Sequence, residues 1–370
     1  MLADRRRDAS LSLPASLALL AALSLSAWCA GCAGGDGDGP WPDLESGLDA
    51  REPLDCAAPA RPPERLSQHP CFAGQPPRLV GGFVPYDVQA PFWSDGLVKE
   101  RAVGVPDDAL VDVRADGTVE LPAGSIAVKR FLDRARAVET RILTIGEDGG
   151  ADGATYLWTE DGTDARRADR STTVDVSGGI WTAPGPEDCA RCHGGASGGL
   201  LGLRVAQLNR DFDYAGDRTA NQIATWVHIG LVDAGALERP DRLPRMAAYG
   251  DRRAPVADRA RAYLASNCAH CHRPGGEGGS AIDLRWETPL DLTRSCDVTP
   301  ELGDPWDGEG TLLRPGVPGR SVLLSRMASD DPLWRMPPVG SARVDQEAVA
   351  LIEEWITSLT GCDDSDGASR

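Results

Sequence analysis

Two copies of one short motif constrain this chain more than any other feature of its sequence. The first is Cys189-Ala-Arg-Cys-His193 and the second is Cys268-Ala-His-Cys-His272. Each has the pattern Cys-x-x-Cys-His, which is the attachment signature of c-type haem. Two thiols one helical turn apart can each form a thioether with one vinyl group of the same porphyrin, and the next imidazole then meets the iron. The sequence therefore predicts two haems c, with thioethers at Cys189, Cys192, Cys268 and Cys271 and with His193 and His272 as proximal iron ligands.

Zinc sites and redox dithiols also use paired cysteines. A zinc site of this kind has its second Cys/His pair roughly 12–20 residues from the first, whereas Cys192 and Cys268 are much further apart in this chain. A thioredoxin-like dithiol does not need a histidine directly after its second cysteine, and here that histidine occurs twice. Both alternatives stay open, but the repeated motif favours haem.

Length and charge limit the classes of partner. The chain has 370 residues, enough for two or three domains, and its formal net charge is -18. So acidic a protein is poorly suited to nucleic acid or to an anionic lipid surface. We therefore expect redox proteins as partners, with basic ones favoured by the charge, and no nucleic acid.

The N-terminus has the composition of a secretory signal over residues 1–31. A basic start precedes an apolar run from Leu11 to Ala27, which is short for a spanning helix. The end of this segment, Cys29-Ala-Gly-Cys32, resembles a bacterial lipobox, in which Cys32 would be acylated. Ala33 follows, where an aspartate would indicate retention in the inner membrane. We expect a periplasmic protein anchored to the outer membrane by a lipid on Cys32; a soluble periplasmic protein and an uncleaved anchor are the alternatives.

Four cysteines remain after the haem motifs and the export signal are set aside. They are Cys56, Cys71, Cys296 and Cys362, which allow three pairings. Free thiols tend to be oxidised in an oxidising compartment. We favour Cys56–Cys71, which closes a short proline-rich loop, and Cys296–Cys362, which ties the last haem region to its C-terminus.

Composition and motif positions suggest an order of segments along the chain. The expected segments are the signal peptide 1–31, a flexible tether and leader 32–78, a β-rich domain 79–182, a first haem domain 183–252, a second haem domain 253–362 and a disordered tail 363–370.

Short alternating segments predict strands in the β-rich region. A hairpin signal, Asp116-Gly117, separates 110–115 from 118–121, and further strands are expected at 125–131, 138–145, 154–158 and 172–176. About six strands with turns between them indicate a sandwich or a small barrel.

Helices are expected in both haem regions. Asn221–Ile229 has the pattern of a short helix that Gly230 ends, Val256–Ser266 leads into the second motif, and an amphipathic helix follows Asp345 as its N-cap. The predicted fold class is α+β and multidomain, with a β-rich sandwich or barrel-like domain followed by two mainly α, cytochrome c-like haem domains.

Methionine and histidine supply the candidates for the sixth iron ligands. Met336 lies in Arg335-Met-Pro-Pro338, where prolines stiffen a loop just before the C-terminal helix. A thioether ligand opposite histidine raises the reduction potential and suits electron transfer. Met327 stands at helical spacing among leucines, so we expect it in the core. Met336 is therefore the predicted sixth ligand of the second haem.

The first haem has three candidates for its sixth position. Met246 precedes the next segment in the way that Met336 precedes the last helix, and it is the first candidate. His228 is the rival, and an open or water-bound iron is the third possibility. His270, inside the second motif, is expected to face away from the iron of that motif.

An aromatic stretch precedes the strands. Pro91-Phe-Trp-Ser-Asp-Gly96 is followed by Lys99 and Arg101. It has the composition of a binding surface, but we favour a packed aromatic corner beside solvated charges.

Together these segments resemble the poorly characterised bacterial dihaem c-type cytochromes with a β-rich N-terminal region. The resemblance is carried by 91–96 with Lys99 and Arg101, by 138–143, 156–158, 207–211 and 259–276, and by Met336-Pro-Pro338 and Glu354-Trp-Ile356. It covers roughly residues 63–362. It implies two haems c, the second in a part similar to class I cytochromes c, and it implies no established substrate.

The expected function is electron transfer between periplasmic or membrane redox partners, without catalysis. The enzymatic alternative is a dihaem peroxidase or oxidase, and the other is a haem-based ligand sensor; both would use an open first haem. No histidine or glutamate stands out as an aid to O–O cleavage, so the carrier is favoured.

Overall fold

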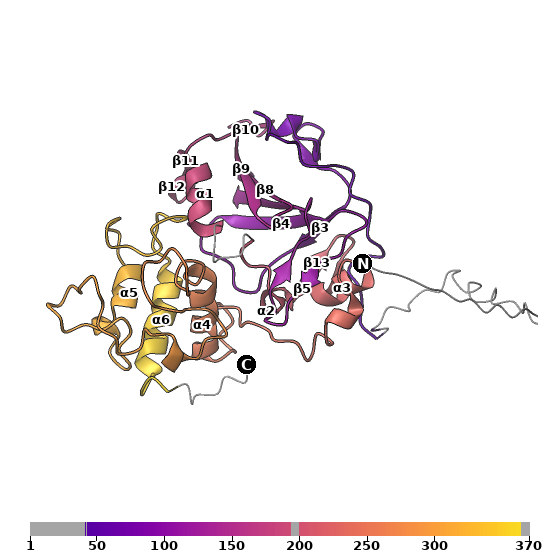
Figure 1. The fold of residues 1–370 in the computed structure, drawn as a ribbon. Helices are drawn as coiled ribbons and strands as arrows, with labels where there is room; N and C mark the ends of the chain where they lie inside the picture. Colours follow the sequence, from indigo (N-terminus) through magenta and orange to yellow (C-terminus); the bar gives the residue numbers. More distant parts are fainter. Residues whose placement is uncertain (1–40, 42, 194–199, 364–370) are drawn as a thin grey trace, which may run out of the picture. The chain divides into compact units, whose positions relative to one another are not determined.

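The computed structural model describes residues 41, 43–193 and 200–363. The chain separates into Met1–Asp38 and Gly39–Arg370, and the fold described below lies in the second unit (Figure 1). The predicted signal peptide, the lipidation candidate Cys32 and the C-terminal tail after residue 363 lie outside the described residues. Among the helices that are described, none combines the length and the apolar character of a membrane span.

An antiparallel sheet of six strands organises the first half of the fold. Its order is β10-β9-β8-β7-β4-β3. The strands are β3 (Phe83–Tyr86), β4 (Val98–Gly104), β7 (Ile126–Asp133), β8 (Arg136–Ile145), β9 (Ala151–Trp158) and β10 (Ala165–Arg167). Side chains alternate between the two faces of a strand, and each face of this sheet has its own apolar contacts.

Four small sheets of two strands complete the described β structure. They pair β1 (Phe72–Ala73) with β2 (Arg78–Leu79), β5 (Asp112–Val113) with β6 (Val119–Glu120), β11 (Thr172–Val176) with β12 (Gly179–Ala183), and β13 (Asp211–Tyr214) with β14 (Arg218–Asn221). The predicted Asp116-Gly117 turn joins β5 to β6, and Gly117 has a φ of 78°, a conformation that glycine adopts without strain.

The α-helices are short except for two near the C-terminus. They are α1 (Pro186–His193), α2 (Val205–Leu208), α3 (Gln222–His228), α4 (Val256–Asn267), α5 (Val322–Met327) and α6 (Gln346–Ser358), with 3-10 turns at η1 (Leu66–Gln68), η3 (Ala234–Ala236), η4 (Leu290–Leu292) and η5 (Pro318–Arg320). Asn221 caps α3, and its side chain accepts hydrogen bonds from the N–H groups of Ile223 and Ala224.

The predicted sandwich or barrel is wrong. The six-stranded sheet is open, because β3 and β10 lie at its two edges and do not pair with each other. One face is covered by the leader, in which the described strands are only those of the short β1–β2 sheet, through a cluster of Leu66, Cys71, Phe72, Ile126, Val128, Ile142, Tyr156 and Ala165. The disulfide Cys56–Cys71 holds that leader together. A segment without long strands can therefore close one side of a sheet.

The prediction of two mainly α haem domains is also wrong. More of the described residues lie in strands than in α-helices. In their described part, residues 183–252 contain the short helices α1, α2 and α3, the 3-10 turn η3, the β13–β14 hairpin and the last residue of β12. Ile223, Trp226 and Val227 of α3 share one core with strand residues such as Val84 and Val103. This region buries its apolar side chains against the β structure, so it does not form a core of its own.

The C-terminal region has a separate apolar cluster. Helices α4 and α6 pack together through Ala260, Tyr263, Leu264, Ala348, Leu351, Ile352, Trp355 and Ile356. The predicted N-cap is confirmed, since the Asp345 side chain accepts a hydrogen bond from the N–H of Ala348 at 3.1 Å. Long segments without helix or strand connect these helices.

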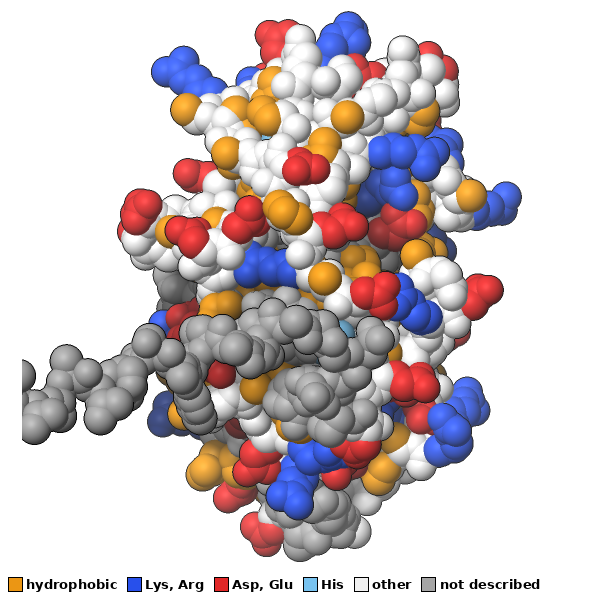
Figure 2. All heavy atoms as spheres, turned by 90° about the vertical axis from the view of Figure 1, so that its right-hand side faces the viewer, with side chains coloured by type: hydrophobic (Ala, Val, Ile, Leu, Met, Phe, Trp, Pro, Cys, Tyr) orange, Lys and Arg blue, Asp and Glu red, His pale blue; other side chains and the backbone are white. Residues whose placement is uncertain are grey.

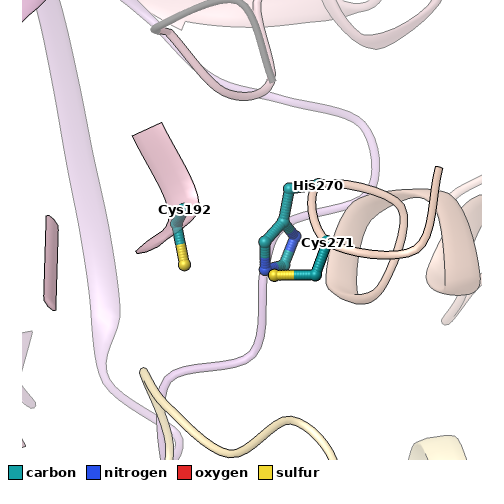
Figure 3. Close-up of side chains that lie close together, drawn as sticks. All are labelled: Cys192, His270 and Cys271. Carbon is teal, nitrogen blue, oxygen red and sulfur yellow. The ribbon is translucent and has the colours of Figure 1, made fainter. Parts of the chain in front are cut away.

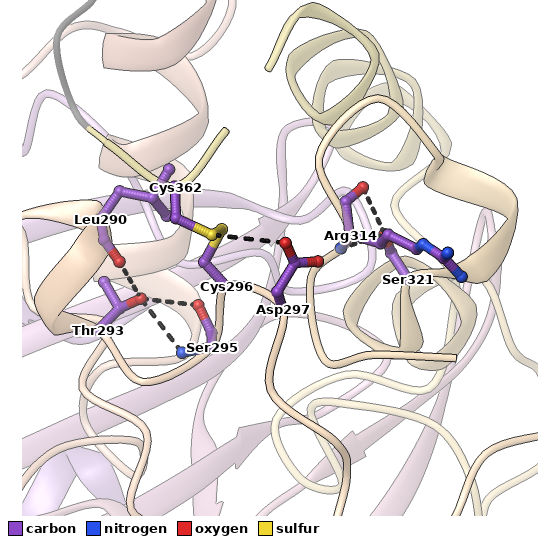
Figure 4. Close-up of a disulfide and its surroundings, with 8 residues drawn as sticks. All are labelled: Leu290, Thr293, Ser295, Cys296, Asp297, Arg314, Ser321 and Cys362. Carbon is purple, nitrogen blue, oxygen red and sulfur yellow. Dashed lines mark hydrogen bonds between the residues drawn. A yellow bond between two sulfur atoms is a disulfide. The ribbon is translucent and has the colours of Figure 1, made fainter. Parts of the chain in front are cut away.

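A disulfide fastens the end of the chain to this region. Cys296 and Cys362 are bonded, which is the second pair favoured by the sequence (Figure 4). Beside it, the hydroxyl of Thr293 donates to the carbonyl of Leu290 at 2.7 Å and lies 2.8 Å from the hydroxyl of Ser295. This network fixes the loop that leads into Cys296.

The charged side chains are interspersed on the face drawn in Figure 2, where acidic, basic and apolar groups are mixed.

The predicted tether is described only from residue 41 onward, and the described residues between 41 and 63 contain no helix or strand. They contact the folded part all the same: the N–H of Gly47 donates to the Thr225 hydroxyl at 3.0 Å, and Arg51 donates to the carbonyl of Ala109 at 2.9 Å.

Candidate haem-binding sites

The second Cys-x-x-Cys-His motif begins where α4 ends. Cys268 is the C-cap of that helix, and its N–H donates to the carbonyl of Leu264 at 2.9 Å. The N–H groups of Cys271 and His272 then both donate to the carbonyl of Cys268, at 3.1 and 2.8 Å. The motif therefore forms a tight turn after the helix rather than part of its last turn.

The loop after the motif closes against His272. Its Nδ1 atom lies 3.1 Å from the hydroxyl of Ser280. Gly278 passes so close that a Cβ there would lie 2.8 Å from the same Nδ1 atom, which is why the position requires glycine. Burial lowers the pKa of His272. A neutral imidazole is the form that ligates a metal, and a hydrogen bond to one ring nitrogen orients the other.

A cavity of about 720 Å³ opens beside this motif. That volume falls within the usual range for small-molecule sites, about 300–1,000 Å³. Cys268, Cys271, His272 and Met336 all line it. Its apolar lining includes Ile282, Leu284, Val298, Leu302, Leu312, Val322, Leu323 and Met327. The donor set of two thiols, one imidazole and one thioether in an apolar cavity fits the chemistry of haem c.

Met336 reaches this cavity from the loop before α6. Its N–H donates to the carbonyl of Arg326 at 3.0 Å, which ties the loop to α5. The Arg326 guanidinium stacks on the ring of Trp334 at 4.6 Å and donates to the carbonyl of the same residue. Met327 also lines the cavity, but it is buried in the core of α4 and α6, as expected.

The first motif occupies α1. Cys189 and Cys192 lie one helical turn apart, and His193 is the last residue of the helix. The N-terminus of α1 is held by Asp188, whose carboxylate accepts hydrogen bonds from the hydroxyl of Ser171 and from the N–H of Gly185. Burial raises the pKa of Cys189. Residues 194–199, directly after His193, are outside the described part of the chain.

The two motifs meet at one point. The Cys192 and Cys271 thiols and a His270 ring nitrogen lie within 4.8 Å of one another (Figure 3). Hydrogen bonds with Cys192 and His270 lower the pKa of Cys271. His270 was expected only to face away from the iron of its own motif, and its position beside the first motif is a feature that the sequence did not indicate.

The aromatic stretch 91–96 joins the sheet to the second motif. The N–H of Trp93 donates to the side chain of Asn267 at 2.7 Å, and the Phe92 ring meets the His270 ring edge-on at 5.6 Å. The Asp95 carboxylate accepts hydrogen bonds from the N–H of Ala342, close to the Met336 loop. The predicted packed corner is present, and it contacts segments on both sides of the cavity.

The charges beside that corner are not solvated, contrary to expectation. The Arg101 side chain is 6% exposed and pairs with Asp87. The Lys99 ammonium donates to the carbonyl of Phe92 at 2.8 Å. The sequence did carry one signal for these positions, because Lys99 and Lys129 are the only lysines in a chain with 38 basic residues.

The candidates for the sixth ligand of the first haem are not brought to α1 by any contact among the described residues. Met246 is buried among Ala90, Ala206 and Ala262. His228 is exposed on the last turn of α3. Both assignments therefore stay predictions from the sequence. No protein-family model, curated protein or solved structure matches the chain.

Proposed function

We propose that this protein is an exported dihaem c-type cytochrome that passes electrons between periplasmic or membrane redox partners. The observation that carries the proposal is the cavity that Cys268, Cys271, His272 and Met336 line together. Haem c, when bound, supplies a one-electron iron couple. The chain's own contribution is attachment, ligation and exclusion of water.

Each residue of the cavity has a distinct role in this proposal. Cys268 and Cys271 would form the thioethers, and His272 would supply the imidazole that Ser280 orients. Met336 would supply a second protein ligand, a thioether, and a thioether ligand raises the reduction potential of haem iron. The apolar lining lowers the local dielectric and limits the reorganisation of solvent that accompanies a change of charge.

The meeting of the two motifs supports electron transfer within the chain. The thiols of Cys192 and Cys271 lie within 4.8 Å of each other, and each would carry a thioether to a different porphyrin. Attachment at these two sulfur atoms would bring two one-electron groups together within one chain.

The cellular setting of the proposal rests on the sequence. The N-terminal segment has the composition of a lipoprotein signal with Cys32 as the acylated residue. The net charge of -18 favours a basic redox partner. Replacement of Cys32 by alanine would release such a protein from the membrane fraction.

An open first haem remains the alternative within haem chemistry. It is favoured by the positions of Met246, buried among alanines, and His228, exposed on α3. An iron with a free position could bind a small ligand or peroxide. A zinc site is the alternative without haem: among the described residues, the cluster of Cys192, His270 and Cys271 offers three ligands, one fewer than a structural zinc site takes.

Absorption spectra and metal analysis of the protein matured with haem test all three hypotheses: the electron carrier, the open first haem and the zinc site. Pyridine haemochrome analysis should give two haems per chain, and zinc should be absent by metal analysis. Carbon monoxide added to the reduced protein should leave the spectrum unchanged if both irons have two protein ligands. Binding at one haem would favour the enzyme or sensor alternative, and a protein with zinc and no haem would overturn the proposal.

A further inference from the structure

Four basic side chains lie together on one face of the six-stranded sheet. Arg101 of β4 is paired with Lys129 of β7, and Lys129 is paired with Arg141 of β8. Side chains of residues directly opposite in antiparallel strands point to the same face. Lys99 lies two residues before Arg101 and therefore shares that face. We call these four residues the cation row.

The cation row has too few anions for its charge. Asp87 pairs with Arg101 and also with Arg210, at 3.0 Å from the latter. Glu139, fully buried, pairs with Arg141. No ion pair of the described residues involves the two lysines.

Lys129 is the member without a polar partner. Among the described residues, its ammonium makes no hydrogen bond, and it lies 5.7 Å from the centre of the Phe131 ring. Burial, together with the charges of Arg101, Arg141 and Lys99, holds the pKa of Lys129 well below its usual value. Burial likewise lowers the pKa of Lys99 to about 7. A carboxylate placed here would satisfy the charges and restore the protonated form of both amines.

The use of lysine at this place is selective. Apart from Lys99 and Lys129, all the Lys and Arg residues of this acidic chain are arginines. A guanidinium stays charged under all ordinary conditions, whereas a buried lysine amine can lose and regain its proton. Within the cation row, the two lysine amines are therefore the groups that can take up a proton when an anion binds.

The Arg141 end of the cation row lies close to the first Cys-x-x-Cys-His motif. Gly153 of β9 is paired with Leu143 of β8, two residues from Arg141, so it faces the same side of the sheet. A Cβ at Gly153 would point toward the Cys189 sulfur, 4.0 Å away. The charge of Arg141 also acts on the Cys189 thiol and opposes the rise of its pKa. A porphyrin bound at Cys189 would thus begin beside this face of the sheet.

We propose that Lys99, Arg101, Lys129 and Arg141 form a carboxylate-binding site that holds the propionates of the first haem. The inference rests on the proposed function. Vinyl groups and propionates occupy opposite edges of haem, so attachment of one edge at Cys189 directs the carboxylates away from that sulfur. The cation row leads away from Cys189 in the same way, because Arg101 lies two strands beyond Arg141 and each strand spacing is about 5 Å.

The only two lysines make a direct test possible. Amine acetylation of the holoprotein, followed by mass spectrometry, reports Lys99 and Lys129 separately. The reference is the double variant Cys189→Ala/Cys192→Ala, which keeps the second haem. We expect acetylation of Lys129 to be slower in the holoprotein by about tenfold or more, because a rise of one pKa unit reduces the neutral amine about tenfold.

The outcomes of the labelling separate the two hypotheses. Equal rates in the two proteins, with haem shown by mass at the first motif, would overturn this inference alone. Absence of haem at Cys189 and Cys192 would overturn the proposed function and the inference with it. Protection of Lys129 by added succinate in the variant, without protection by haem, would assign the row to a free carboxylate and overturn the propionate assignment.

A second readout separates propionate binding from simple shielding. In the resonance Raman spectrum, Lys129→Met should shift the propionate bending band of one haem. Arg130→Met is the matched control, since Arg130 is the next residue on β7, points to the opposite face and pairs with Glu100. An unchanged band in Lys129→Met would overturn the inference, as would an equal shift in the control.

Discussion

In the proposed cytochrome, Met336 would determine the character of the second haem. It lines the cavity with His272, and its N–H is bound to the carbonyl of Arg326. Replacement of Met336 by alanine should leave the second iron with one protein ligand. We expect a high-spin signal and binding of carbon monoxide to the reduced protein, both of which absorption spectroscopy can measure.

Met327→Ala is the matched control for that change. It removes a methionine from the same cavity, but one that packs in the core of α4 and α6. Its expected effect is a loss of stability of about 2–5 kcal/mol without carbon monoxide binding. If Met336→Ala left the spectrum unchanged while Met327→Ala opened the iron, the two roles assigned here would be reversed.

At the scale of single residues, the sequence predicted the disulfides well and the surroundings of charged groups poorly. The favoured pairings Cys56–Cys71 and Cys296–Cys362 are both confirmed. Burial of Arg101 could not be predicted. A charge beside an aromatic stretch gives no local sign of which segment will cover it, because the covering segment comes from elsewhere in the chain.

At the scale of elements, α6 begins at a buried carboxyl group. Burial raises the pKa of Asp345 above its usual value, although the hydrogen bond from Ala348 lowers it. A raised pKa in the folded state means that this group contributes stability below its unfolded value, about 3.9, and that the contribution is lost as pH rises through the folded value. The folded state therefore disfavours the ionised form of Asp345 relative to the unfolded chain.

Asp345→Asn should remove this pH dependence and keep the cap. The amide oxygen can still accept the hydrogen bond from Ala348, so the variant should gain stability relative to the wild type as pH rises from about 4 to 7. Asp345→Ala should instead lose about 1 kcal/mol, because it lacks the cap. Chemical denaturation at several pH values measures both; a stability difference between Asp345→Asn and the wild type that stays constant with pH would contradict the assigned pKa direction.

Elements with strong local patterns were predicted closely, whereas their assembly was not. The helix predicted over Val256–Ser266 is α4, and the strand predicted over 138–145 lies within β8. Periodicity indicates which residues of an element are apolar. It does not say whether the apolar face of α3 will meet another helix or, as observed, the strands that carry Val84 and Val103.

At the scale of the whole molecule, the two motifs meet although many residues separate them along the chain. The contact between Cys192 and Cys271 depends on the sheet, on α1 and on the stretch 91–96, which reaches Asn267. No short-range pattern predicts such a contact. It has a chemical consequence that can be measured in protein produced without haem.

Protein matured without haem should form a disulfide between Cys192 and Cys271 on mild oxidation. Their sulfur atoms lie within 4.8 Å, and hydrogen bonds with Cys192 and His270 lower the pKa of Cys271, which favours the reactive thiolate. Peptide mapping without reduction should find this cross-link beside the two structural disulfides. Cys271→Ser should abolish it, and haem attachment should prevent it, since the thioethers consume both thiols. Cross-links confined to Cys189–Cys192 and Cys268–Cys271 would mean that the two motifs do not meet in solution.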